Sequence, residues 1–423
     1  MSALRHLLRL PICVDAPTMK FIPKIDEIIE AHDDSTETLT CGVELEFLLP
    51  SIDHVAQDPD PDIANKLLYR STSRTPEIAH EEIRKQLITT LGQLEGVSFR
   101  AMDDDDFHPP HDNVAVYDSW RLGSDRTVNK DCEGNGCSKT SYNWTGCELT
   151  SPVMNTHDYA TNVDNICRVL KTVRIHLNKS TSVHVHVGRG DEPFSLLTVH
   201  KFVTLYWLTE NAIFGLHHPS RETNRYCLPL TKYSVLAKQS QSALDSEDGC
   251  PNDQGHRFED YVSEAGLSRL RRTQLRRIWT CGSIEEVAKL MWIRIDMDWK
   301  LPGPDERGAV GFCRFLPAGK SGGNISTFEW RQMSGSVDSN HINQWIKACI
   351  AFTDFCRLSD KVAFKEFVGK VIEKGDSYTG IELLKALDVD SYIFQVMRGV
   401  WARNRHFCNS DQGRELFLSI DEL

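Results

Sequence analysis

Four short segments of the chain alternate apolar and polar side chains with the period of two that is typical of a half-buried β-strand. They cover residues 41–49, 144–152, 181–188 and 325–333. In the first segment, Val43, Leu45 and Phe47 would lie on one face of the strand, and Glu44 and Glu46 on the other. The other three segments follow the same pattern. Each strand is therefore predicted to have one apolar and one ionisable face.

The ionisable faces of these strands carry mostly carboxylates and imidazoles. Together they present Glu44, Glu46, Glu148, His184, His186, Glu329 and Arg331. If the strands share one sheet, removing each of these carboxylates from water costs on the order of several kcal/mol unless cations compensate. One arginine cannot compensate so many carboxylates, whereas divalent cations could. Oxygen ligands with a single histidine suit Mg²⁺ or Mn²⁺ better than a structural zinc site.

Each segment taken alone also fits an exposed strand of an antiparallel sheet, with one solvated face. Such strands carry threonine and lysine as readily as glutamate. The joint occurrence of Glu-x-Glu at Glu44, His-x-His at His184 and Glu-x-Arg at Glu329 therefore favours a shared metal site. About two or three ions facing solvent would form a platform for phosphoryl transfer.

Helical periodicity is clear in three other parts of the chain. Apolar residues recur at helical spacing over 163–173 and 342–350, with Asp338 and Ser339 as candidate N-caps of the latter helix. A helix over 196–214 is apolar nearly all round and is predicted to be buried, and several short helices are expected after Leu358. The irregular stretches 50–78, 103–112, 129–143 and 240–256 are predicted to be surface loops. This mixture predicts an α+β fold with a large antiparallel sheet.

Composition narrows the class of protein. The 423 residues carry a net charge of -12, which disfavours a general affinity for nucleic acid or anionic membranes. The 13 cysteines are scattered and odd in number, which is typical of reduced core residues in a cytoplasmic protein. No run of apolar residues is long enough for a membrane span, and the acid-free start over 1–14 is too weakly apolar for a secretory signal. A mitochondrial presequence stays open.

The charged strands, in this order, resemble the amidoligase family of carboxylate-amine ligases, relatives of glutamine synthetase and glutamate-cysteine ligase. The matching segments are Gly42–Phe47, Trp120 with Asp125, Glu148–Pro152, Ser182–Gly188, Arg221–Cys227 and Thr327–Arg331. The resemblance implies a glutamine-synthetase-like antiparallel sheet folded into a funnel with surrounding helices. With the helical pattern of the C-terminal part, we expect an N-terminal extension over 1–39, a catalytic domain over 40–358 and a C-terminal helical segment over 359–423.

The resemblance assigns a role to each residue that matches the family's pattern. Glu44 and Glu46 resemble paired carboxylates that bind two different metal ions, and Glu148 resembles a further ligand of the ion nearer the substrate. His184 and Glu329 resemble ligands of the ion that bridges the phosphates of ATP. His186, Arg331, Arg221 and Arg225 are candidates for contacts with the transferred phosphate or the substrate carboxylate.

The implied reaction transfers the γ-phosphoryl group of ATP to a carboxylate, with Mg²⁺ or Mn²⁺, and an amine then attacks the acyl phosphate. Its substrates would be a small-molecule or peptide carboxylate and an amine, and the protein could form an oligomer. The chain departs from the family's pattern over 126–142, which is long and could reshape the mouth of the substrate site. Cys132 and Cys137 of this stretch, with the nearby Cys147, lack the spacing of a zinc knuckle.

Two other functions stay open. His184, His186 and one glutamate could hold a single iron for oxygen chemistry, as in cupin-type enzymes. A binding or regulatory protein could also keep the fold without turnover.

Overall fold

The computed structural model describes most of the chain. The described residues are 38–61, 65–94, 97–101, 117–128, 142–190, 192–247, 257–293, 307–312, 315 and 326–403. The predicted N-terminal extension and the long stretch 126–142 lie almost entirely outside them, as do Cys132 and Cys137.

The described strands form one open sheet. They are β1 (Thr40–Asp53), β2 (Tyr69–Ser71), β3 (Phe99–Ala101), β4 (Trp120–Ser124), β5 (Asn143–Thr150), β6 (Met154–Asn155), β7 (Ser182–Gly188), β8 (Val310–Gly311) and β9 (Phe328–Ser334). The order across the sheet is β3-β4-β5-β1-β7-β9-β8, and β2 and β6 also pair with β1. The pairing is antiparallel except between β1 and β2 and between β3 and β4.

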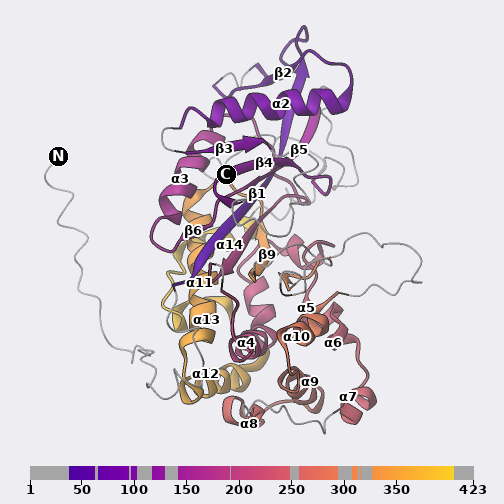
Figure 1. Ribbon diagram of the computed structural model, residues 1–423, viewed down its shortest axis with the longest axis vertical. Coiled ribbons are helices and arrows are strands. Elements are labelled where there is room, and N and C mark those ends of the chain that lie inside the picture. Colours follow the sequence, from indigo (N-terminus) through magenta and orange to yellow (C-terminus); the bar gives the residue numbers. More distant parts are fainter. Residues whose placement is uncertain are drawn as a thin grey trace, which may run out of the picture.

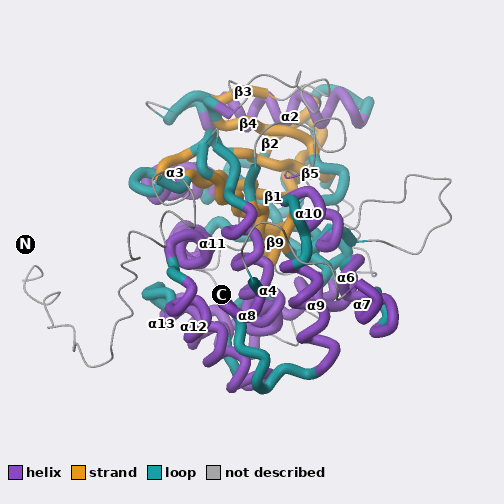
Figure 2. Tube along the Cα trace, turned by 60° about the horizontal axis from the view of Figure 1, so that its bottom comes forward, coloured by secondary structure: helices purple, strands orange, loops and turns teal. Residues whose placement is uncertain are grey.

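Helices surround this sheet, which confirms the α+β class (Figure 1). They are α2 (Pro76–Leu91), α3 (Tyr159–Leu170), α4 (Leu196–Phe214), η5 (Pro219–Thr223), α5 (Leu230–Tyr233), α6 (Val235–Lys238), α7 (Gln241–Glu247), α8 (Phe258–Tyr261), α9 (Arg269–Trp279), α10 (Ile284–Met291), α11 (Ser339–Leu358), α12 (Lys361–Lys374), η7 (Gly375–Ser377), α13 (Gly380–Ala386) and α14 (Tyr392–Arg403). Figure 2 shows α2 beside β2, β3 and β4, and most other helices grouped around α4.

The apolar faces of the strands build the main core. Leu45 of β1 lies opposite Leu149 of β5 and Val183 of β7, and all three side chains are buried. The ring of Phe202 in α4 stacks on Phe328 of β9 with ring centroids 3.6 Å apart. Helix α4 packs between the sheet and the outer helices, and this confirms the burial predicted from its apolar sequence. The core therefore fixes one face of the sheet and leaves the other for the polar residues.

Most predicted elements are confirmed, with two corrections. Helix α11 begins after Asp338, whose Oδ1 accepts hydrogen bonds from the backbone N–H groups of Asn340 and His341 at 2.9 and 3.2 Å. The stretch 240–256 is not wholly a loop, because α7 occupies its start and buries Leu244 beside α9. The stretch 50–78 includes the end of β1, all of β2 and the start of α2.

Candidate metal centre

The strand register brings the ionisable residues together on one face of the sheet. The directly opposed pairs are Glu44 with His184, Glu46 with Glu148, and His186 with Glu329. Residues opposite one another on antiparallel strands share a face, with Cβ atoms about 5 Å apart. Because β5, β1, β7 and β9 are consecutive in the sheet, residues far apart in the chain form one cluster.

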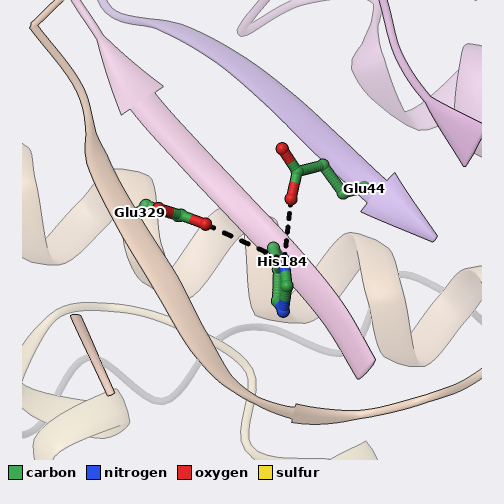
Figure 3. A group of neighbouring side chains, drawn as sticks. All are labelled: Glu44, His184 and Glu329. Atoms are coloured by element: carbon green, nitrogen blue, oxygen red, sulfur yellow. Dashed lines mark hydrogen bonds and ion pairs between the residues drawn. The ribbon is translucent and has the colours of Figure 1, made fainter. Parts of the chain in front are cut away.

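His184 lies at the middle of this cluster, with Glu44 and Glu329 reaching it from the strands on either side (Figure 3). Its Nδ1 is 2.7 Å from Oε2 of Glu44 and 3.8 Å from Oε1 of Glu329. Its Nε2 is 2.8 Å from Oγ of Ser182 and 3.4 Å from Oε1 of Glu46. The Ser182 hydroxyl also donates a hydrogen bond to Glu46. The two nitrogens of one imidazole therefore face two different sets of acids.

These side chains form two overlapping groups of potential metal ligands. The groups are Glu44, His184 and Glu329, and Glu46, Glu148 and His184. Within each group, one ligand atom of every residue lies within 4.8 Å of the others. Carboxylate oxygens with a single imidazole fit Mg²⁺ or Mn²⁺. The two groups together contain the five residues that the sequence predicts as metal ligands.

A glycine on the edge strand makes room for one of these ligands. Gly311 of β8 lies opposite Glu329 of β9. A Cβ atom at Gly311 would come within 2.6 Å of Oε2 of Glu329, closer than real side chains pack. The absence of a side chain at this position thus leaves Glu329 free to turn toward His184.

The four carboxylates do not share the same electrostatic surroundings. Burial raises the pKa of Glu44, but the charge of His186 and the hydrogen bond with His184 outweigh this effect and hold that pKa well below its usual value. Burial also opposes ionisation of Glu329, yet the Arg331 guanidinium lowers its pKa. Neighbouring histidines and one arginine therefore favour the ionised forms of these two acids.

The other two acids are in the opposite situation. Burial raises the pKa of Glu46. Burial and the nearby Glu44 and Glu46 hold the pKa of Glu148 well above its usual value, and Asp125 contributes to the same effect. The charges of His184 and Arg221 lower the pKa of Glu46 without outweighing burial. A divalent cation between Glu46 and Glu148 would favour the ionised forms of both acids.

A β-bulge shapes the arginine side of the cluster. The pairs Val183 with Met333 and Val185 with Trp330 leave Arg331 and Gln332 together opposite His184. Arg331 forms an ion pair with Glu329. The buried Arg221 donates from Nη2 to the backbone oxygen of Arg331 at 2.7 Å, so it holds the bulge in place. Bulges commonly re-aim a side chain next to an active site.

The structure places the two remaining predicted residues, His186 and Arg225, differently. Nε2 of His186 is 3.0 Å from Oε1 of Glu44, and its Nδ1 is 3.2 Å from Oγ1 of Thr327. His186 belongs to neither of the two ligand groups found among the described residues. Arg225 is exposed, and its guanidinium lies over the ring of Tyr226, with 5.2 Å between the guanidinium carbon and the ring centroid. The geometry thus joins His186 to the cluster and leaves Arg225 outside it.

Three residues of the polar face carried no role in the sequence prediction. Ser182 bridges the two ligand groups, Gly311 makes room for Glu329, and Arg121 of β4 lies opposite Thr150 of β5. Ser182 follows the alternation of a predicted strand, so a survey of all polar positions on the four predicted strands would have found it. Arg121 lies on β4, which was not among those strands.

Comparison with known proteins identifies the family of the chain. A family model described as "putative amidoligase enzyme" matches residues 37–277, more than half of the chain. The match spans β1, β5 and β7, while Glu329 and Arg331 lie beyond its end. A search of curated proteins found no match. Among the helices of the described residues, none has the length and apolar character needed to cross a membrane. The chain belongs to the amidoligase family, whose description indicates an amide-forming ligase.

Proposed function

We propose that this protein is an ATP-dependent ligase that joins a carboxylate to an amine and releases ADP and phosphate. The observation that carries the proposal is the pair of overlapping acid and histidine groups on one face of the sheet. A cluster of several buried carboxylates is unfavourable unless cations compensate it, because like charges in a buried site repel one another. It suits metal ions that bind ATP.

The ligand groups suggest which residues would hold each ion. Glu44, His184 and Glu329 would hold one ion, and Glu46 and Glu148 a second. When bound, Mg²⁺ or Mn²⁺ would neutralise the charge of the phosphates and of the substrate carboxylate. This matters because a carboxylate is a poor electrophile, and its negative charge repels both the phosphoryl donor and the nucleophile.

The proposed reaction has two steps. A carboxylate oxygen of the substrate attacks the γ-phosphorus of ATP, the bond to the β,γ-bridging oxygen breaks, and ADP leaves. An amine then attacks the carbonyl carbon of the acyl phosphate, loses a proton and expels inorganic phosphate. The planar fork of Arg331 lies beside Glu329 and would orient the transferred phosphoryl group, with Arg221 as a positioning residue behind it.

Two further features belong to the proposal: the shape of the sheet and the choice between a ligase and an iron enzyme. We propose that the sheet forms a glutamine-synthetase-like funnel, with ATP entering from one side and a small-molecule or peptide carboxylate from the other. A single-iron site would need His184 and His186 in the same ligand group. Because His186 joins neither group among the described residues, the arrangement favours the ligase over the iron enzyme.

Trapping with hydroxylamine tests the proposal without knowledge of the natural amine. The protein would be incubated with ATP, Mg²⁺, hydroxylamine and a panel of carboxylic acids, amino acids and peptides. We expect equal amounts of ADP and hydroxamate with the correct acid, and neither product with Glu44→Ala. Release of AMP instead of ADP would show that the acid is activated by adenylation and not by phosphoryl transfer. If no acid led to consumption of ATP, the result would favour a non-catalytic protein.

A further inference from the structure

A buried arginine of β4 lies on the polar face of the sheet, outside the predicted site. The neighbours of Arg121 in the chain, Trp120 and Leu122, are buried in the apolar core, so strand alternation directs Arg121 to the opposite face. Arg121 lies opposite Thr150 of β5, and Thr150 lies opposite Glu44 of β1. Arg121 therefore shares a row across the sheet with the metal cluster (strands labelled in Figure 1).

Arg121 is only 7 % exposed, and its Nε is buried without a hydrogen-bond partner. No hydrogen bond or ion pair of its two terminal nitrogens is found among the described residues either. Another buried arginine, Arg174, shows the pairing with a carboxylate that Arg121 lacks. Arg174, which is 2 % exposed, donates two hydrogen bonds to the carboxylate of Asp58, at 2.7 and 2.6 Å. An unpaired buried charge is unfavourable, so the surroundings of Arg121 call for an anion that the described residues do not provide.

The separation between Arg121 and the metal cluster indicates where an anion bound by Arg121 would lie. Strands lie about 4.8 Å apart, so two strand spacings place the backbone of Arg121 about 10 Å from that of Glu44. An anion held by Arg121 would therefore lie on the β4 side of the cluster, away from the Glu44, His184 and Glu329 group. Arg331 lies on β9, beyond β7, so the two guanidinium groups flank the cluster from opposite sides.

We propose that Arg121 binds a second carboxylate of the acid substrate, whose first carboxylate is activated at the metal centre. This inference rests on the proposed function and narrows the substrate to acids with two anionic groups, such as dicarboxylic acids or acidic amino acids and peptides. The Glu46 and Glu148 group lies between Arg121 and the ion assigned to the ATP phosphates, which places the acid on the Arg121 side. The planar guanidinium suits a carboxylate.

The variant Arg121→Met separates this role from a structural one. Methionine keeps a long side chain and removes the unpaired charge, so the thermal midpoint of the ligand-free protein should stay equal or rise. The probes are linear dicarboxylates from malonate to adipate with aspartate and glutamate, and butyrate as the monocarboxylate, titrated in Mn²⁺ without nucleotide. We expect at least one dicarboxylate to bind the wild type about tenfold or more tightly than butyrate, and Arg121→Met to lose this preference.

Arg168→Met is the matched control, because Arg168 is exposed on α3 and contacts Asn165. It should leave the preference for dicarboxylates unchanged. A lower thermal midpoint of Arg121→Met would show a structural role and overturn the proposal. The proposal would also be overturned if the wild type bound dicarboxylates no more tightly than butyrate, or if Arg121→Met kept the preference for dicarboxylates. Weaker binding of an ATP analogue to Arg121→Met, with dicarboxylate binding intact, would assign Arg121 to phosphate instead. Nucleotide binding by the wild type tests the ligase proposal separately.

Discussion

Ser182 connects the two ligand groups of the metal centre through a single hydroxyl. Its Oγ donates a hydrogen bond to Glu46 and lies 2.8 Å from Nε2 of His184. Because the hydroxyl hydrogen is used on Glu46, Oγ accepts from Nε2, and Nε2 must carry a hydrogen. The other nitrogen, Nδ1, faces Glu44 and Glu329 and is the candidate metal ligand. Partners of this kind orient a metal-binding histidine and select its tautomer.

Removing this hydroxyl should weaken metal binding without unfolding the protein. We expect Ser182→Ala to bind Mn²⁺ about tenfold more weakly, because His184 loses the partner that fixes its ring. Ser182→Thr keeps a hydroxyl and serves as the control. Electron paramagnetic resonance of free Mn²⁺ would measure both affinities, and equal affinity in Ser182→Ala and the wild type would remove Ser182 from this role.

At the scale of elements, the close approach of β8 and β9 sets the position of Glu329. A Cβ atom at Gly311 would lie 3.3 Å from the Cβ of Glu329, as well as within contact of its carboxylate. We expect Gly311→Ala to displace that carboxylate and to weaken Mn²⁺ binding, with calorimetric titration as the measurement. Gly369→Ala is the control, because nothing lies within 4 Å of a Cβ there, and it should stabilise α12 by about 0.5–1 kcal/mol. Wild-type Mn²⁺ affinity in Gly311→Ala would show that the glycine is not required.

The elements that were predictable from sequence have regular patterns. Period-two alternation identified β1, β5, β7 and β9, and continuous apolar character identified α4. Helix α9 was not predicted, because it carries many arginines and few apolar residues. Its burial depends on residues such as Leu275 and Ile278, and Arg276 pairs with Glu264 outside the helix. Partners of this kind come from tertiary structure and leave no local signal.

The site was predictable as a set of residues but not as an arrangement. Alternation placed Glu44, Glu46 and Glu148 on ionisable faces, yet no local pattern gives the register that sets Glu46 opposite Glu148. The bulge beside Arg331 could not be predicted from the sequence either, because it results from how β7 and β9 pair. The unpaired state of Arg121 is also a property of the folded chain.

At the scale of the whole molecule, a buried histidine makes stability depend on pH. Burial lowers the pKa of His341 from 6.5 to about 4, beside Phe394 and Trp401. The folded state therefore disfavours the protonated ring, and the stability it contributes is complete above pH 6.5 and is lost as the pH falls toward 4. This loss amounts to about 3 kcal/mol.

We expect His341→Phe to reduce the loss of stability between pH 6.5 and pH 4, because it removes the group that takes up the proton. Urea unfolding at a series of pH values would measure the effect. A variant with the same pH dependence as the wild type would show that other groups, such as the buried His217, dominate acid unfolding.

Binding of an ATP analogue tests the whole account most directly. Calorimetric titration with a non-hydrolysable analogue would be made with and without Mn²⁺, on the wild type, on Glu329→Ala and on Glu373→Ala, which changes an exposed glutamate of α12. We predict binding that requires Mn²⁺, is lost in Glu329→Ala and is unchanged in Glu373→Ala. Binding that is independent of Mn²⁺, or equal affinity in the wild type and Glu329→Ala, would contradict the metal centre and with it the proposed ligase.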